Sequence, residues 1–371
     1  TFSIVGQMPI GEVILALIFP WVLVKTVKRH GWPGRIQQLA WFKLLLLLLG
    51  LMALGYVASD LYRNTPSDNL ERGWARVAFL GIDLVAIPYL IDRSWGRLQI
   101  FLLALYLGDA VNALIGGLPF EDWWKFGLGQ VAAALVLFAF AGRGRMLQIA
   151  AALGMAGLSF LFGARSLGGI CLLTAGLFGV HYARGILRPI ALFASLGTAI
   201  ALLVAANSII LSHQEHEGSN VERRSMLETA GDAFVSSPFI GQGSWFIATR
   251  KLAELEANRA YRDPRFRHYT PEEARAIAIH SQILVALAEG GILGGAFFLG
   301  YAALLLKSLG TLLRHSVPFV ALSAYIVFTG FWNLLMSPFS GVARVEIVLI
   351  VCNCLLLILQ RQGELADVYR E

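Results

Sequence analysis

The sequence predicts an all-α protein that crosses a membrane many times, and three observations lead to this prediction. Of its 371 residues, 57% are hydrophobic and only 15% are charged, and the mean hydropathy is +0.66. A soluble core cannot bury so much apolar surface, whereas a polytopic membrane protein leaves it in contact with lipid. About eleven apolar runs are long enough to cross a hydrocarbon layer of about 30 Å. One long polar segment, 213–280, interrupts them.

Each apolar run is expected to form one helix, so the bundle should contain about 11–12 transmembrane helices. The expected spans are 8–26, 40–58, 74–91, 98–117, 126–142, 146–163, 168–182, 188–212, 281–306, 317–337 and 344–360. The polar segment then divides the chain into an N-terminal transmembrane bundle over 1–212, a catalytic loop over 213–280 and C-terminal transmembrane helices over 281–371.

The short turns between the helices predict the orientation of the chain. One alternating set of turns is rich in Lys and Arg, and the positive-inside rule assigns that set to the cytoplasm. These basic residues are Lys25, Lys28, Arg29, Arg35, Arg93, Arg97, Arg143, Arg145, Arg184, Arg188, Lys307, Arg314, Arg361 and Arg370. The opposite set contains 59–73, the turn at 121–124, the turn at Arg165, the long loop and 337–344. We therefore expect the loop to face outward, which at a bacterial inner membrane means the periplasm.

Composition excludes other classes of function. The net charge of +6 does not indicate nucleic-acid binding, because the basic residues lie mainly in short turns. The three cysteines lie inside apolar runs, and no spacing of His, Cys or carboxylate residues resembles a metal site, so neither a metal nor a cofactor is expected. Asp83 and Asp109 also lie inside apolar runs, where a carboxylate is costly. Asp83 has either a structural partner or a function, and Asp109 is close enough to a helix end to be hydrated.

Local patterns predict the internal structure of the loop. Apolar residues at helical spacing favour an amphipathic helix over 223–236, and they are Met226, Leu227, Ala230, Ala233 and Phe234. Pro238, Gly241 and Gly243 then predict a turn, in which glycine N–H groups either approach a ligand or only shape the backbone. A second helix is expected over 246–261.

The end of the loop predicts a capped helix that reaches the membrane surface. Thr270 is a candidate N-cap, Pro271 the first helical residue and Glu273 the capping-box partner. Such a helix brings His280 to its third turn, next to the apolar run that follows. A neutral imidazole there can accept a proton from a hydroxyl group, although a histidine at an interface can also be structural.

Outward-facing arginines complete the candidate chemistry. Arg165 lies in a short Gly-flanked turn, and Arg223 and Arg224 begin the amphipathic helix. A guanidinium group matches phosphate geometry and stays charged at any depth, so these arginines either bind a diphosphate or anchor ordinary lipid phosphate. With His280 as a base and arginines neutralising a leaving diphosphate, the set suits group transfer from a lipid diphosphate.

Several segments carry a resemblance to a known family. Residues 280–284 read His-Ser-Gln-Ile-Leu and 289–294 read Glu-Gly-Gly-Ile-Leu-Gly, while 223–243 contains an Arg followed by a Pro-x-x-Gly-x-Gly turn. These patterns resemble the O-antigen ligase and polymerase superfamily of bacterial envelope glycosyltransferases. The Trp that this family places four residues after the Arg is Leu227 here. Arg165 followed by a serine is a further point of resemblance.

The resemblance implies a C-type glycosyltransferase fold and a reaction at the periplasmic side without a nucleotide sugar. The implied donor is a glycan on undecaprenyl diphosphate. Arg165 and Arg223 would bind the diphosphate, and His280 would activate the acceptor hydroxyl. Arg224, Gly241, Gly243 and Ser281 are the further predicted substrate-binding residues. The partners would be the donor, a lipid A core acceptor and membrane lipids.

Alternative functions remain open at this point. We favour an O-antigen ligase that transfers a finished glycan to lipid A core, and a polymerase of repeat units would use the same donor chemistry. A secondary transporter would instead use Asp83 or Asp109 near the membrane midplane and would show inverted repeats, which the sequence lacks. A non-enzymatic scaffold would leave the outward His and Arg residues without a role.

Overall fold

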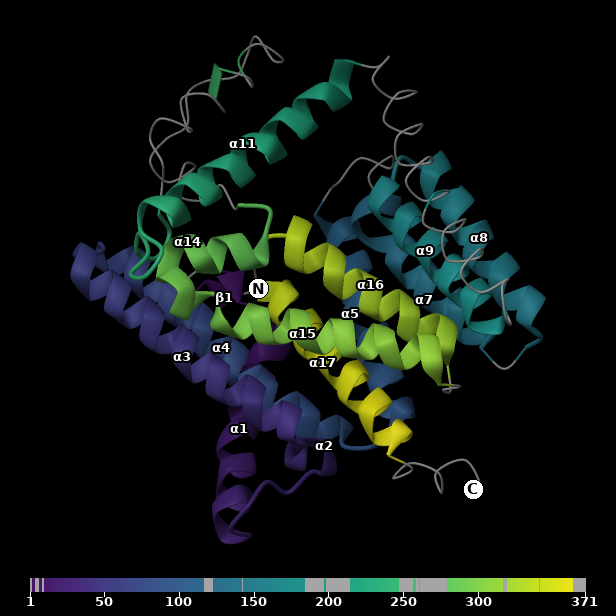
Figure 1. Ribbon diagram of the computed structural model, residues 1–371, viewed down its shortest axis with the longest axis horizontal. Helices are drawn as coiled ribbons and strands as arrows, with labels where there is room; N and C mark the ends of the chain where they lie inside the picture. Colours follow the sequence, from purple (N-terminus) through teal and green to yellow (C-terminus); the bar gives the residue numbers. More distant parts are fainter. Residues whose placement is uncertain are drawn as a thin grey trace. The chain divides into compact units, whose positions relative to one another are not determined.

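A computed structural model describes residues 2–3, 7–8, 10–116, 123–141, 143–183, 197, 214–246, 256–257, 260, 279–315, 319–339 and 341–362. Apart from one short hairpin, the regular structure in these residues is helical, which confirms the predicted class of a polytopic helix bundle (Figure 1). Six helices within the described ranges are long and apolar enough to cross a membrane. The expected helices over 188–212, over 246–261 and from Thr270 lie largely outside the described residues.

The chain forms two compact units, each built from three separate stretches of sequence. The first unit consists of Thr1–Asp92, Leu211–Ala303 and Asn333–Val348. The second consists of Arg93–Ile210, Leu304–Trp332 and Leu349–Glu371. The described part of the long loop therefore belongs to the same unit as the first helices of the chain.

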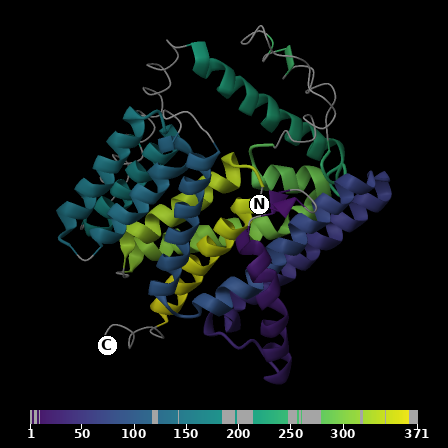
Figure 2. The ribbon, with the colours of Figure 1, turned by 180° about the vertical axis from the view of Figure 1, so that it is seen from behind.

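The first unit is organised around α3 and α4. It contains β1 (Phe2–Ser3), β2 (Gln7–Met8), α1 (Ile10–Lys28), α2 (Arg35–Gln38), α3 (Ala40–Arg63), α4 (Ser67–Ile91), α11 (Gln214–Ser236) and α14 (Gln282–Gly294). The two strands pair antiparallel. Helix α3 packs against α4 and α14, α1 packs against α4, and α11 packs against α14. Figure 2 shows α3 and α4 side by side from behind.

The described part of the second unit contains five helical segments from the middle of the chain. They are α5 (Trp95–Ile115), the π-helical segment η1 (Trp124–Leu128), α7 (Gly129–Ala139), α8 (Arg145–Leu161) and α9 (Arg165–Tyr182). Helices α8 and α9 form a hairpin whose turn contains Gly163 at φ 70°. Three further helices contribute residues to both units, namely α15 (Ala296–Arg314), α16 (Val320–Met336) and α17 (Gly341–Arg361).

The connection between α3 and α4 is much shorter than the expected polar turn over 59–73. Helix α3 continues to Arg63, and its C-cap Asn64 adopts φ 51°, a left-handed conformation that asparagine tolerates. Pro66 then precedes the first residue of α4. Most of the charged residues expected in a loop are thus held on helix ends, where their positions are fixed.

The apolar run expected as one span over 281–306 is two helices, so that prediction was wrong. Ser281 caps α14 by accepting a hydrogen bond from the Leu284 N–H at 3.3 Å. Gly291 has φ 64° and ψ −159°, which interrupts the helix, and Gly295 ends it. Hydropathy does not register this break, because glycine is neutral to a hydropathy scale but permissive to the backbone.

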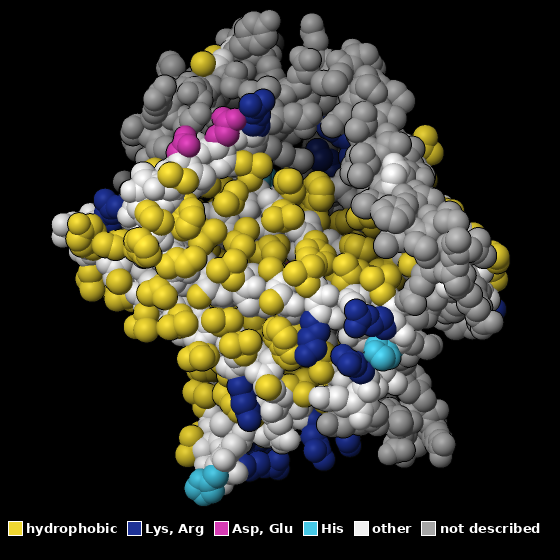
Figure 3. All heavy atoms as spheres, viewed as in Figure 1, with side chains coloured by type: hydrophobic (Ala, Val, Ile, Leu, Met, Phe, Trp, Pro, Cys, Tyr) yellow, Lys and Arg dark blue, Asp and Glu magenta, His cyan; other side chains and the backbone are white. Residues whose placement is uncertain are grey.

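Hydrogen bonds within the first unit connect segments that the sequence predicted as separate turns. The Arg35 N–H donates to Asp92 at 2.7 Å, which joins two of the basic turns. The Arg63 side chain donates to the Gly241 carbonyl at 2.9 Å, which joins the α3 end to the loop. Among the side chains coloured by type in Figure 3, most of those on the surface shown are hydrophobic, as in a membrane protein.

Candidate functional site

The turn that follows α11 lies directly against α14. Gly241 and Gly243 adopt φ 83° and 89°, which confirms the turn predicted from the glycines. The Gln242 N–H donates to the Ala288 carbonyl at 2.9 Å, and the Ile292 N–H donates to the Pro238 carbonyl at 2.8 Å. The backbone of the turn therefore pairs with the backbone of α14 on both sides of its kink.

Glycines make this close approach possible. A Cβ atom at Gly241 would overlap the Glu289 carbonyl, and one at Gly291 would overlap the carbonyl of Phe239. The Gly241 N–H donates to Ser237 at 2.9 Å, and the Gly243 N–H reaches the Glu289 carbonyl at 3.0 Å. Both N–H groups are thus hydrogen-bonded within the protein, so the geometry gives the two glycines a structural role in the contact between the turn and α14.

Glu289 is the acceptor on which several elements converge. Its Oε1 accepts from the Trp245 N–H at 3.0 Å, and its Oε2 accepts from the Tyr56 hydroxyl at 2.9 Å. Arg76 forms an ion pair with the same Oε2, and the two charged side chains are only 6% and 7% exposed. Such a pair is held by strong charge-assisted hydrogen bonds, and neither charge can be removed alone without leaving the other buried.

Aromatic rings enclose the Arg76 guanidinium. Its central carbon lies 5.7 Å from the Tyr56 ring centroid, 5.3 Å from Trp245 and 4.9 Å from Phe339. These distances are in the range of cation–π contacts, which favour arginine over lysine. The first unit thus holds a buried charged cluster between α3, α4, the turn and α14. We call this cluster, formed by Tyr56, Arg76, Trp245 and Glu289, the charged joint.

Asp60 fixes the far end of the turn. Its carboxylate accepts from the Ser244 N–H at 2.6 Å, the Ser244 hydroxyl at 2.8 Å and the Trp74 indole at 2.9 Å. Arg63, one turn further along α3, donates to the Ser237 hydroxyl at 2.8 Å. The turn is therefore clamped to the ends of α3 and α4 by side chains and to α14 by its backbone.

His280 lies half-buried at the residue before the cap of α14. Neither Ile279 nor His280 is helical, so the expectation that His280 lies on the third turn of a helix was wrong. The reason is local: Ser281 begins a new helix, and its hydroxyl both caps α14 and donates to the Leu334 carbonyl at 3.3 Å. Ser281 is 1% exposed, so its hydroxyl is used within the protein.

Apolar packing holds the His280 segment against α11. Ala230 and Ala233 of α11 form a buried cluster with Ala288 of α14, and Ile279 packs against it. Ala230 and Ala233 come from the face that the 3.6-residue period predicted to be apolar, so the amphipathic helix predicted over 223–236 is confirmed. The expectation that Arg223 and Arg224 begin this helix was wrong, because α11 starts at Gln214 in a polar stretch that the apolar period does not cover. The residue next to His280 is thereby anchored between two helices.

The predicted arginines fall in different parts of the fold. Arg224 is exposed on α11 and pairs with Glu228 at 2.8 Å, a hydrogen bond that raises the pKa of its guanidinium. Arg223 belongs to the same helix, but its side chain lies outside the described part of the structure. Arg165 is the first residue of α9, in the second unit. The first unit thus gathers α11, the turn and His280.

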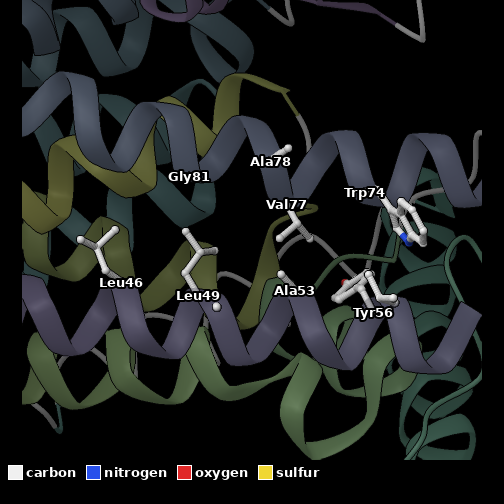
Figure 4. Close-up of a pocket in the computed structure, with 10 residues that line it drawn as sticks. Leu46, Leu49, Ala53, Tyr56, Trp74, Val77, Ala78 and Gly81 are labelled. Carbon is white, nitrogen blue, oxygen red and sulfur yellow. The ribbon is translucent and has the colours of Figure 1, made fainter. Parts of the chain in front are cut away.

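An apolar pocket of about 410 Å³ lies between α3 and α4. Figure 4 shows Leu46, Leu49 and Ala53 on α3 with Val77 and Ala78 on α4. Small residues leave this hollow where two helices would otherwise touch. The polar groups of Tyr56 and Trp74, at one end of the pocket, are those that reach Glu289 and Asp60.

The sequence prediction omitted the residues that form the charged joint. Tyr56, Asp60, Arg76 and Glu289 were not among the candidate site residues. A signal for two of them was present, because Arg76 and Glu289 both interrupt apolar runs and carry opposite charges. Among the described residues, no cluster of His, Cys, Asp and Glu could hold a metal ion.

Comparison with known proteins gives one clear result. A family model described as O-antigen ligase matches residues 128–299, a range that includes Arg165, Arg223 and His280 as well as Glu289. The match confirms the resemblance found in the sequence motifs, and with the apolar helices it indicates a multi-pass membrane protein of glycosyltransferase type. No match was found among the curated proteins with which the chain was compared.

Proposed function

Because a family model described as O-antigen ligase matches residues 128–299, we propose that the chain transfers a glycan from undecaprenyl diphosphate to the lipid A core. The reaction would take place at the periplasmic side of the bacterial inner membrane. The family description supports the donor class, and the predicted outward orientation of the loop supports the location. No nucleotide sugar takes part in this reaction.

His280 is the proposed general base. In the transfer, the acceptor hydroxyl gives its proton to the imidazole, and its oxygen attacks the anomeric carbon of the donor sugar. The bond from that carbon to the phosphate oxygen breaks, and its electron pair leaves with undecaprenyl diphosphate. The His280 side chain is half-buried, and an imidazole group suits this step because in its neutral form it can accept a proton.

Arg165 and Arg223 are the proposed ligands of the diphosphate. Guanidinium groups bind phosphate oxygens in pairs and stabilise the negative charge that develops on the leaving group. Arg224, beside Arg223 in the middle of α11, adds positive charge to the same stretch of the helix, although its side chain is already paired with Glu228.

The observation that carries the proposal is that α14 supports α11, the glycine turn that follows α11, and His280. Helix α11, which contains Arg223, packs on α14 through the alanine cluster. The glycine turn pairs with the α14 backbone, and His280 directly precedes the α14 cap. An enzyme needs its base and its binding groups held by rigid elements, and α14 is such a support.

The pocket between α3 and α4 supports a lipid-linked substrate. Its wall is almost entirely apolar, and it lies between two helices that are long enough to cross a membrane. A hydrocarbon chain could lie there without loss of a hydrogen bond, with the polar part of the molecule toward the charged joint.

The test is a transfer assay with the purified protein in lipid. A lipid-linked oligosaccharide and lipid A core are supplied, and the rate of glycan transfer is compared for wild type, His280→Ala, Arg165→Ala and Arg223→Ala. Losing the base should lower the rate by about 10²–10⁴-fold. The matched control is His30→Asn, because His30 is exposed and asparagine tolerates its positive φ of 51°. Unchanged transfer by His280→Ala would refute the proposed role.

The acceptor can be tested in the same assay. A second lipid-linked oligosaccharide is offered in place of lipid A core, since a repeat-unit polymerase uses the same donor chemistry with that acceptor. Transfer to lipid A core alone supports the ligase. Elongation of the lipid-linked oligosaccharide would assign the chain as a polymerase instead.

A further inference from the structure

A second buried charged cluster lies in the first unit, separate from the joint at Glu289. Glu12 comes from the first turn of α1, Asp83 from α4 and Arg344 from the first turn of α17. Glu12 and Asp83 are fully buried, and Arg344 is 8% exposed. Charged groups so deeply buried in a membrane-spanning protein require compensation.

Glu12 and Arg344 compensate one another. Arg344 donates from Nε to Glu12 Oε1 at 2.8 Å and from Nη2 to Glu12 Oε2 at 2.6 Å. This is the parallel two-bond geometry that guanidinium and carboxylate groups favour. The Arg344 guanidinium also lies 5.7 Å from the Phe79 ring centroid. One positive charge is therefore matched by one negative charge before Asp83 is counted.

Asp83 adds a carboxyl group with no donor to satisfy it. No N–H or O–H group in the described part of the chain reaches either of its buried oxygens. Its electrostatic neighbours are the Glu12 carboxyl and the Arg344 guanidinium, and the helices that carry Glu12 and Asp83, α1 and α4, pack against each other. Two ionised carboxylates have only acceptors, so they cannot form a hydrogen bond with each other unless one holds a proton.

We propose that Glu12, Asp83 and Arg344 form a proton-binding site, in which one proton lies between the two carboxyl groups. The bound proton makes the cluster neutral, because one carboxylate then balances one guanidinium. It also supplies the missing hydrogen bond between α1 and α4. Carboxyl pairs that share a site commonly hold one proton between them, and the pair rather than either residue then titrates.

The site is distinct from the proposed transfer chemistry. None of its three residues contacts the glycine turn or His280 in the described interactions, and all three lie outside the matched range 128–299. The nearest further titratable group on α17 is Glu346, which accepts a hydrogen bond from Asn333 at 2.6 Å. The proton-binding site therefore does not depend on the proposed glycan transfer.

The first test is infrared spectroscopy of the purified protein. A protonated carboxyl group has a C=O stretch that is separated from the bands of a carboxylate and shifts on transfer to D₂O. We expect this band in the wild type at neutral pH and its loss in Asp83→Asn. Asp109→Asn, which removes another carboxyl from an apolar helix, is the matched control and should keep the band. Labelling aspartate with ¹³C in the wild type should shift the band and needs no variant.

The second test is the pH dependence of the thermal midpoint. The folded protein would hold a proton that the unfolded chain releases at neutral pH, so rising pH should lower the midpoint of the wild type. Asp83→Asn should remove this fall, because its amide donates to Glu12 at every pH. A wild-type protein with no acid band that responds to ¹³C-aspartate would overturn the proposal. A midpoint raised by Na⁺ would replace the proton with a metal cation and would equally overturn it.

Discussion

At the scale of single residues, Glu289 connects α14 to α3, to α4 and to the glycine turn. Its carboxylate accepts from Tyr56 of α3, Arg76 of α4 and the Trp245 backbone, and its carbonyl accepts from the Ser59 hydroxyl at 2.6 Å. One residue thus fixes the spacing of two transmembrane helices and the turn. Its role is to position the elements that surround it.

Glu289→Gln is predicted to destabilise the protein strongly. The amide keeps the shape of the side chain but leaves the Arg76 guanidinium buried without an opposite charge. Breaking such a pair typically costs about 3–5 kcal/mol. Thermal unfolding in detergent, followed by tryptophan fluorescence, measures the effect.

Two comparisons make the Glu289 prediction specific. Glu228→Gln breaks an exposed pair of the same chemistry on α11 and should leave the midpoint nearly unchanged. The double variant Arg76→Met with Glu289→Gln removes both charges and should recover part of the loss. If Glu289→Gln unfolded at the wild-type midpoint, the charged joint would not contribute to stability.

At the scale of elements, the glycine turn can be tested by one methyl group. Gly241→Ala should destabilise the protein by about 2 kcal/mol or more, because a positive φ disfavours alanine and the new Cβ meets the Glu289 carbonyl. Gly231→Ala is the matched control, since Gly231 lies inside α11 with nothing near its Cβ position. Alanine there should stabilise the helix by about 0.5–1 kcal/mol. Equal effects of the two variants on the thermal midpoint would contradict the prediction.

The pocket between α3 and α4 can be filled without disturbing its walls. The position of a Cβ at Gly50 meets no other atom, so Gly50→Leu should fill part of the pocket and keep α3 intact. If the pocket holds the lipid chain of the donor, the KM for that donor should rise several-fold with little change in kcat. Gly108→Leu on α5 makes the same change away from the pocket and should leave the KM unaltered. An unchanged KM in Gly50→Leu would exclude the pocket as the lipid site.

The sequence predicted elements well where apolar periodicity is sustained, and less well where glycine decides. The 3.6-residue period located α11 and its buried alanines, and the two glycines of the turn located its positive φ angles. Hydropathy joined α14 and α15 into one span because it does not register the backbone freedom of Gly291. Similarly, His280 was placed on a helix because a serine cap one residue later is a weak signal.

At the scale of the whole molecule, the orientation of the chain can be tested by thiol labelling. The native thiols at Cys171, Cys352 and Cys354 are all buried, so a membrane-impermeant maleimide should not react with the wild type. Asp232→Cys on exposed α11 should be labelled in cells whose outer membrane alone is permeable. Gln38→Cys, exposed on α2, should be labelled only after the inner membrane is also opened. Labelling in the reverse order would invert the proposed topology.

The division into units shows what hydropathy could not predict. A count of apolar runs predicted most of the helices, whereas the contacts of the chain place the described part of the loop in one unit with α3 and α4. Arg76 and Glu289 each interrupt an apolar run, yet nothing in either run identifies the other as its partner. Their pairing depends on how helices pack in three dimensions, and a hydropathy pattern does not show which helices pack together.

The separation of these two residues has a consequence for synthesis of the protein. Arg76 lies 213 residues before Glu289. At a translation rate of about 5–20 residues per second, its partner is made on the order of 10–40 s later. During that interval an unpaired guanidinium is costly inside lipid, which favours holding the first turns of α4 at the water interface. Helix α4 would therefore reach its final depth in the membrane only after α14 has been synthesised.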